Sequence, residues 1–332
     1  MRRGFLVLCI TLFSFVATGS CDLALARSNG RTSLAPKSKQ QTSVKAKSSK
    51  QKGNAARQTI VKSAPKSKTK VTSPLLAKLS AKSAIVLDAQ NGAPLMRLAD
   101  EEPRQPASTI KVLTGLIALK SLHKDESVQV SRRASDMPRS KVDLVAGRHY
   151  QAHDLINAVL LASANDASVA LAEKIAGSET DFARMMTMRA ELWGAKNTVC
   201  KTANGLTAPG QQTTARDLAV IFRHAMRDPE FARRMGQISA RTREGMTLKN
   251  HNKALWNIEG AVGGKTGYTV AAGKTYVGQF ERNGAKIIVA VMGSADMWQD
   301  IGLLVEYGFQ QHQLHSDQVQ ARTSGARDRT IN

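Results

Sequence analysis

A serine and a lysine three residues apart, Ser108 and Lys111, begin a segment, 110–119, that is apolar on most of its faces. On a helix this spacing places both side chains on one face, one turn apart. A serine hydroxyl becomes an effective nucleophile when a base removes its proton, and a lysine is such a base when burial lowers its pKa. The alternative is a serine that caps the helix and a lysine whose ammonium reaches water. S-x-x-K occurs four more times in the chain, so the spacing alone is weak evidence.

A second polar pair, Ser163 and Asn165, forms the only S-x-N sequence in the chain. It lies between two segments of helical periodicity, where a hydroxyl and a carboxamide can face the same cleft. The hydroxyl can then relay a proton while the carboxamide holds a substrate amide. The alternative is a break between two helices that these side chains cap.

A third pattern, Lys265-Thr266-Gly267, occurs once and is followed by Tyr268. Glycine weakens a strand, so Gly267 indicates that another group approaches the backbone closely. Lys265 and Thr266 then offer a cation and a hydroxyl to a carboxylate that lies along the strand. The alternative is a bulged strand whose polar residues face solvent.

The elements that must position these residues are hairpins and helices. Segments 83–87 and 93–98 flank Gln90-Asn91-Gly92, and segments 274–281 and 285–292 flank Asn283-Gly284, so a hairpin is predicted at each end of the body. The predicted helices are 110–119, 154–161, 167–175, 178–194, 215–226, a short one from 229, and 296–309. This order predicts an α/β (α+β) fold with one antiparallel sheet, flanked by helices, and an inserted, mostly helical subdomain. A cleft between the two parts is the expected site.

The 332 residues include 48 Lys+Arg and 26 Asp+Glu, a net charge of +22. Thirteen basic and no acidic residues lie in 27–74, which has too few apolar side chains to fold and is predicted to be a disordered basic Lys/Ser-rich linker. Electrostatic contact with an anionic cell-envelope polymer and a simple spacer both remain open for it. Because it lacks aromatic residues to stack on bases, we expect no nucleic-acid partner. The catalytic body is predicted at 75–310 and a polar disordered tail at 311–332.

Residues 1–26 have the pattern of a signal peptide. Arg2 and Arg3 precede an apolar run, 5–16, that is too short to span a bilayer, and Ala24-Leu25-Ala26 is a typical cleavage pattern. We therefore expect export, with cleavage after Ala26, to the periplasm or cell-wall space, where the protein is soluble or peripherally associated. Lipoprotein processing at Cys21 is the alternative.

Cysteine and histidine spacing excludes two further classes of protein. Cys9, Cys21 and Cys200 are not paired at ligand spacing, which excludes a disulfide scaffold and a Cys-rich metal site. His149 and His153 are four residues apart, but a tyrosine stands where a zinc protease has its glutamate. We expect neither a metal nor a cofactor.

The three motifs occur in the order typical of serine β-lactamases and penicillin-binding proteins, each in the element predicted for it. From about 83 to 309 the chain resembles the low-molecular-mass penicillin-binding proteins that act as D-alanyl-D-alanine carboxypeptidases or endopeptidases. Two further stretches that carry the resemblance are Asn204-Gly205-Leu206 and Thr214-Ala215-Arg216-Asp217-Leu218. The resemblance implies a penicillin-binding-protein/serine β-lactamase-like fold.

The same resemblance implies the roles of the first two motifs. Ser108 forms an acyl-enzyme with the penultimate D-alanine of a peptidoglycan peptide ending in D-Ala-D-Ala, and Lys111 is its general base. Ser163 passes the proton to the leaving group, and Asn165 orients the peptide.

For the third motif, the resemblance implies that Lys265 and Thr266, beside Gly267, recognise the terminal carboxylate. The backbone N–H groups of Ser108 and Tyr268 would form the oxyanion hole. β-Lactams are the expected covalent inhibitors, with no metal required.

Three alternative functions remain at this point. A D,D-endopeptidase would use the same residues. A class A β-lactamase needs a glutamate that activates water, but Glu173 and Glu191 both lie inside predicted helices. A non-catalytic basic wall-binding protein is the third alternative, although no motif position is substituted.

Overall fold

The computed structural model describes residues 74–328, with side chains through His315. The predicted signal peptide at 1–26, both of its processing sites, and residues 27–73 of the predicted linker lie outside the described residues.

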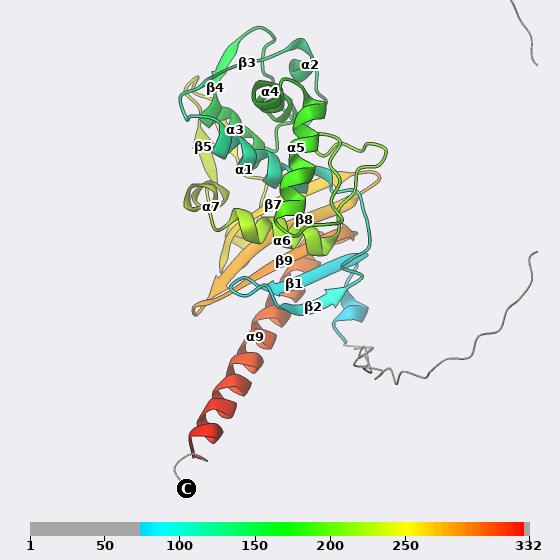
Figure 1. Cartoon of the computed structure of the whole chain (residues 1–332), viewed down its shortest axis with the longest axis vertical. Helices are drawn as coiled ribbons and strands as arrows, with labels where there is room; N and C mark the ends of the chain where they lie inside the picture. The colour runs from blue at the N-terminus through cyan, green and yellow to red at the C-terminus, as the bar shows by residue number, and fades with distance from the viewer. Residues whose placement is uncertain (1–73, 329–332) are drawn as a thin grey trace, which may run out of the picture. The chain divides into compact units, whose positions relative to one another are not determined.

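Strands from both ends of the body form one antiparallel sheet, in the order β2-β1-β9-β8-β7 (Figure 1). Its strands are β1 (Ser83–Asp88), β2 (Pro94–Leu98), β7 (Ala261–Thr269), β8 (Gly273–Arg282) and β9 (Ala285–Ser294). The N-terminal hairpin joins the C-terminal strands because β1 pairs with β9. The predicted sheet is therefore confirmed, and β7, which carries Lys265-Thr266-Gly267, is an edge strand.

The two hairpin turns follow from their sequences. Asn283 and Gly284 both have positive φ, 50° and 79°, as the tightest hairpin turns require. In the other turn, the Asp88 carboxylate accepts hydrogen bonds from the backbone N–H groups of Gln90 and Asn91, at 2.7 and 3.1 Å. These local bonds fix where each chain reversal occurs.

Most helices lie between the hairpins, as predicted. They are η1 (Leu76–Lys78), η2 (Ala107–Ile110), α1 (Lys111–Ser121), α2 (Arg132–Ser135), α3 (Ala152–Leu160), α4 (Asn165–Ala176), α5 (Glu179–Leu192), α6 (Ala215–Ala225), α7 (Pro229–Met235), α8 (Ala254–Asn257) and α9 (Met297–Asp328). Ser178, Thr214 and Asp228 cap α5, α6 and α7 by accepting from the N–H group three residues on.

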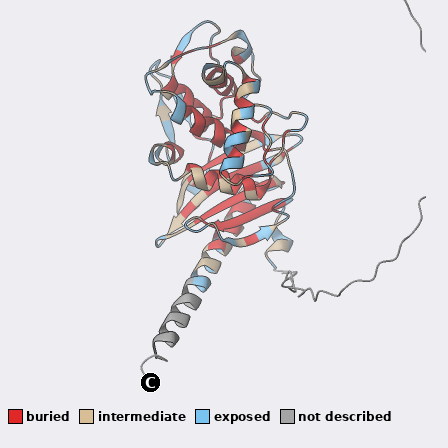
Figure 2. Cartoon of the chain, in the orientation of Figure 1, coloured by how far each residue is buried: buried red, intermediate tan, exposed pale blue. Residues whose placement is uncertain are grey.

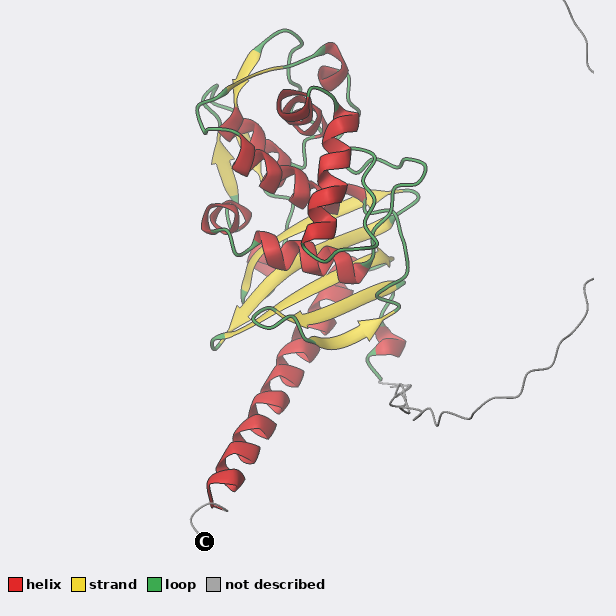
Figure 3. Ribbon diagram, in the orientation of Figure 1, coloured by secondary structure: helices red, strands yellow, loops and turns green. Residues whose placement is uncertain are grey.

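The sheet is covered on both faces, α6 packing on one and α9 on the other (Figures 1 and 3). Alternate residues of β9 enter different cores: Ile288 joins the core of the helical part, and Ile287 joins the core under α9. Strand β1 is consequently buried along its whole length, and the middle residues of β8 and β9 are mostly buried (Figure 2). This explains their nearly continuous apolar sequence.

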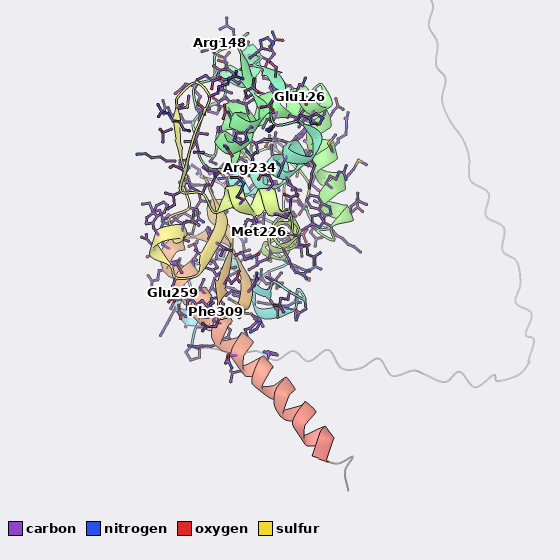
Figure 4. The ribbon with its side chains drawn as sticks, turned by 90° about the vertical axis from the view of Figure 1, so that its left-hand side faces the viewer. Glu126, Arg148, Met226, Arg234, Glu259 and Phe309 are labelled. Carbon is purple, nitrogen blue, oxygen red and sulfur yellow. The ribbon has the colours of Figure 1, made fainter. Side chains whose placement is uncertain are left out.

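A buried arginine joins α7 to α3. Arg234 (labelled in Figure 4) is only 2% exposed. Its guanidinium donates to the His153 carbonyl oxygen at 3.1 Å and to Asn157 Oδ1 at 2.7 Å. These contacts use His153 as a structural partner.

The structure differs from the sequence-based prediction in several short elements and at the C-terminal end. Two small two-stranded sheets, β3 (Ser127–Gln129) with β4 (His149–Gln151) and β5 (Ser239–Arg241) with β6 (Thr247–Lys249), were not predicted, because three-residue strands are too short to show alternation. The short helices η1, α2 and α8 were not predicted for the same reason. The prediction of a disordered tail at 311–332 was wrong as far as Asp328, because α9 continues to that residue. Once the apolar first half is packed, the polar residues extend a helix that is already nucleated. No described helix is both long enough and apolar enough to cross a membrane.

Candidate active site

Ser108 lies in η2, where a glycine from a distant loop supports the backbone. Ala107, the preceding residue, has a φ of 50°. Gly205 has a φ of 81°, and a Cβ added to it would lie 1.9 Å from the Ala107 carbonyl oxygen. Only glycine tolerates both this positive φ and a carbonyl oxygen so close to its Cα. The sequence Asn204-Gly205-Leu206 thus has a physical role, to let the loop pack directly behind the nucleophile.

Lys111 is fully buried at the start of α1 and reaches three oxygens. Its Nζ lies 2.7 Å from Ser108 Oγ, 2.8 Å from Asn165 Oδ1 and 2.7 Å from the Asn204 carbonyl oxygen. Burial lowers the pKa of Lys111 well below its ordinary value, and the nearby charge of Lys265 lowers it further, with partial compensation from Asp166.

The hydrogen-bond partners determine where the lone pair of this neutral amine points. A neutral lysine has two N–H bonds and one lone pair, and both amide carbonyl oxygens can only accept. The two N–H bonds are used by Asn165 and Asn204, so the lone pair faces the Ser108 hydroxyl, which can donate. The arrangement is that of a general base in contact with its nucleophile.

Ser163 and Lys265 form a second serine–lysine pair. Lys265 is 1% exposed, and its Nζ donates to Ser163 Oγ at 2.8 Å and to the Thr266 carbonyl oxygen at 3.0 Å. Burial lowers the pKa of Lys265 to about 7. Ser163 itself has a φ of 59°, in the left-handed region, so the connector holds its hydroxyl in a specific direction.

Asn165 and Asp166 fix the loop that faces the serines. The Asn165 side-chain amide donates to the Pro138 carbonyl oxygen at 2.8 Å. The buried Asp166 carboxylate accepts from the backbone N–H groups of Val142 and Leu144. Asn165 therefore contacts both the base and the opposite wall, which predefines its orientation.

Gly267 brings the edge strand against the nucleophile. A Cβ at Gly267 would lie 2.7 Å from the Ser108 backbone nitrogen and 2.5 Å from Thr275 Oγ1. Thr275 in turn donates to the Pro106 carbonyl oxygen at 3.0 Å. The predicted close approach is therefore present, and its partner is the backbone of η2.

A cleft of about 480 Å³ runs over these groups. Six of the eight predicted site residues line it: Ser108, Ser163, Asn165, Thr266, Gly267 and Tyr268. Lys111 and Lys265 do not line it and act from behind the two serines to which they are bonded. The structure thus brings all eight residues to one place.

Several residues of the site have roles that were not predicted from the sequence. Asn204 contributes only a carbonyl oxygen, which has no side-chain signature. Arg139, His251, Lys274 and Trp298 also line the cleft but belong to no motif. The pKa of His251 is lowered by burial and by the charges of Lys265 and Lys111.

Cys200 lies outside the cleft. It is 4% exposed, and burial raises its pKa to about 12. Such a thiol is unreactive toward electrophiles at neutral pH.

The sequence matches known families over most of its length. Residues 67–296 match the Peptidase_S11 family, described as D-alanyl-D-alanine carboxypeptidase. The chain is 36% identical over 236 residues to the D-alanyl-D-alanine carboxypeptidase DacB2 of Mycobacterium tuberculosis, covering 68% of this chain and 81% of that protein. It is 34% identical over 238 residues to DacD of Escherichia coli, covering 67% of this chain but only 60% of the relative.

Solved structures show the same fold. A D-alanyl-D-alanine carboxypeptidase from Mycobacterium tuberculosis superimposes with a TM-score of 0.66 at 35% identity, over 70% of this chain and 91% of that one. The ampicillin-bound penicillin-binding protein D2 of Listeria monocytogenes gives 0.65 at 28% identity, over 70% and 98%. The predicted fold class is thereby confirmed. With the serine–lysine pairs in place and the match extending over most of its body, the chain belongs to the D-alanyl-D-alanine carboxypeptidase family of serine peptidases.

Proposed function

We propose that this chain is a serine D-alanyl-D-alanine carboxypeptidase that acts on peptidoglycan stem peptides through an acyl-enzyme on Ser108. The observation that carries the proposal is the contact of Lys111 Nζ with Ser108 Oγ at 2.7 Å, with two carbonyl oxygens occupying the other positions around the amine. This geometry supplies an activated hydroxyl at the floor of a peptide-sized cleft.

In the acylation step, Ser108 attacks the carbonyl carbon of the penultimate D-alanine while Lys111 takes its proton. The developing oxyanion is stabilised by the backbone N–H groups of Ser108 and Tyr268, and each such donor contributes roughly 3–4 kcal/mol. The Lys111 ammonium that forms keeps its bonds to Asn165 and Asn204, and the Asp166 charge favours it.

The leaving D-alanine needs a proton on its nitrogen. Ser163 lines the cleft and is bonded to Lys265, so it passes a proton from this second pair to the leaving amine. The Lys111 ammonium then gives up the proton that it took from Ser108, which replaces the proton lost by the Ser163–Lys265 pair and leaves Lys111 neutral. Water attacks the acyl carbonyl carbon while Lys111 takes a proton from it. Lys111 returns that proton to the Ser108 oxygen as the ester bond breaks and the shortened peptide leaves. A β-lactam acylates Ser108 by the same first step.

Mass spectrometry after incubation with benzylpenicillin tests the nucleophile and the base. We expect a covalent adduct on Ser108 that is absent in Ser108→Ala and forms about a hundredfold to ten thousandfold more slowly in Lys111→Ala. An adduct on another residue, or none in the wild-type protein, would refute the mechanism.

Substrate assays distinguish the proposed carboxypeptidase from two alternatives, a class A β-lactamase and a D,D-endopeptidase. Among the described residues that line the cleft there is no Asp or Glu, and Glu173 lies along a different concavity, so a class A β-lactamase water site lacks support. A long-lived penicillin adduct agrees with this, whereas rapid penicillin turnover contradicts it. Parallel assays of D-alanine release from a pentapeptide and of cleavage of a cross-linked dimer distinguish carboxypeptidase from endopeptidase.

The proposed function also requires that the protein is exported from the cytoplasm. Arg2, Arg3, the apolar run that follows and Ala24-Leu25-Ala26 support transport to the periplasm or cell-wall space, where the substrate lies. Sequencing the N-terminus of the mature protein tests it: a start at Arg27 supports cleavage after Ala26, and a modified Cys21 supports lipoprotein processing instead. Deleting 27–74 and measuring sedimentation with cell-wall polymer tests whether this basic segment makes an electrostatic contact.

A further inference from the structure

The cleft contains a hydroxyl whose position suits a ligand. Thr266 lines it, and among the residues that the structure describes, no group bonds to Thr266 Oγ1. The neighbouring Lys265 is 1% exposed, with its Nζ turned to Ser163 and to the Thr266 carbonyl oxygen, so it presents no ammonium to the cleft. An anion beside Thr266 therefore needs a cation from elsewhere.

The register of the sheet brings such a cation to the same face. Thr266 pairs with Tyr276 and Tyr268 pairs with Lys274, so Thr266 and Lys274 are diagonal neighbours across β7 and β8. Because side chains alternate along a strand, these residues share one face, and Lys265 and Gly267 point to the other. The face assignment agrees with the packing, since Tyr276 enters the core under α9 and Val277 enters the core of the helical part.

Lys274 is available to bind an anion. It is exposed, lines the cleft, and has its Nζ 2.6 Å from the Ala295 carbonyl oxygen, which uses one of its three N–H bonds. Within the described part of the chain it pairs with no carboxylate. The other exposed cation of the cleft, Arg139, lies 3.7 Å from Asp143 in the loop opposite.

From these positions we infer that Lys274 and Thr266 together bind the carboxylate of the leaving residue, and that this pair restricts the enzyme to substrates whose leaving group carries a free carboxylate. The inference rests on the proposed function. An extended peptide lying along the edge strand β7 can contact both faces of that strand, with its reacting carbonyl beside Ser108 and its terminal carboxylate beyond Gly267. Trp298 and Met297 line the same side and supply an apolar wall for the methyl group next to that carboxylate.

The test compares two peptides that differ only in the charge of the leaving group. They are L-Lys-D-Ala-D-Ala with both lysine amines acetylated, and its C-terminal amide. With the wild-type protein, kcat/KM for the acid should exceed that for the amide. In Lys274→Met it should fall about tenfold for the acid, mainly through KM, and stay within about twofold for the amide, as expected for a lost charge-assisted hydrogen bond. Lys274→Arg should restore most of the preference.

Three further measurements sharpen the result. Lys286→Met is the matched control, because Lys286 lies on the neighbouring strand β9 and pairs with Glu281 at 3.1 Å outside the cleft. Raising the salt concentration should reduce the acid preference of the wild-type protein and leave that of Lys274→Met unchanged. Thr266→Val and Lys274→Met should be less than additive when combined, since they act on one carboxylate.

The outcomes separate this inference from the proposed function. A wild-type protein that releases no D-alanine overturns both. If the wild-type protein is active, equal losses for acid and amide in Lys274→Met, an unchanged acid preference, or loss of the preference only in Arg139→Gln would overturn the inference alone.

Discussion

Replacing Gly205 by alanine should displace the nucleophile without removing any side chain that takes part in the chemistry. The added Cβ would lie 1.9 Å from the Ala107 carbonyl oxygen, whereas real Cβ atoms essentially never come within 3.0 Å of such an atom. The difference is 1.1 Å, which the loop and η2 must absorb by moving apart. Since Ala107 precedes Ser108, part of this shift reaches the Ser108 hydroxyl and its contact with Lys111. A displacement of about 1 Å in an active site can cost on the order of a hundredfold in rate.

The same substitution should also reduce stability. Alanine at a φ of 81° costs roughly 1–2 kcal/mol, and forcing extra volume into a packed region costs roughly 1–3 kcal/mol. The expected loss in the free energy of unfolding is therefore about 2–5 kcal/mol, measurable by urea denaturation. Circular dichroism at the assay temperature establishes that the variant is folded when its rate is measured.

Gly210→Ala separates strain from displacement. Gly210 lies five positions further along the same loop and has a φ of 72°, but its nearest neighbour to an added Cβ is Lys201 Cε at 3.5 Å. It should lose only about 1–2 kcal/mol of stability and acylate with benzylpenicillin at the wild-type rate. If Gly205→Ala acylates as fast as the wild-type protein, or if Gly210→Ala slows to the same extent, the proposed support of Ser108 by Gly205 is wrong.

Three other predictions follow from the buried titratable groups. Asp166→Asn should shift the acid limb of the acylation pH profile to lower pH. The negative charge of Asp166 raises the pKa of Lys111, so without it the neutral amine persists in more acidic solution. An acid limb that stays in place or moves to higher pH would contradict this. Lys265→Met should reduce the rise of stability with pH. The folded pKa of Lys265 is lowered to about 7 from an ordinary 10.5, so at this residue the unfolded chain binds more protons across that interval, and the contribution of Lys265 to stability increases from about pH 7 to 10.5. Urea denaturation at pH 7 and pH 9 should show a smaller difference for the variant, and an equal difference would remove Lys265 as the cause. Cys200, with its pKa raised to about 12, should resist iodoacetamide at pH 8 in the folded protein and react in urea, as peptide mass mapping would show.

The sequence by itself determined the local structure around each motif. Asn283-Gly284 specified a hairpin because both positions tolerate positive φ, and Ser178, Thr214 and Asp228 specified helix starts because their side chains satisfy free N–H groups. Such signals depend on a few adjacent residues, so they can be read without knowledge of the rest of the chain. The spacing of Ser108 and Lys111 likewise placed both on one side of a helix start.

Only the tertiary structure decided what those motifs do together. Lys111 can serve as a base because Asn165 and Asn204, from two distant parts of the chain, hold its amine. Burial and the charge of Lys265 then lower its pKa. The inward turn of Lys265 and the exposure of Lys274 depend on strand alternation at the sheet edge and on which core each face packs against. Burial and long-range contacts set these properties, and they exist only once the hairpins from the two ends of the body have joined into one sheet.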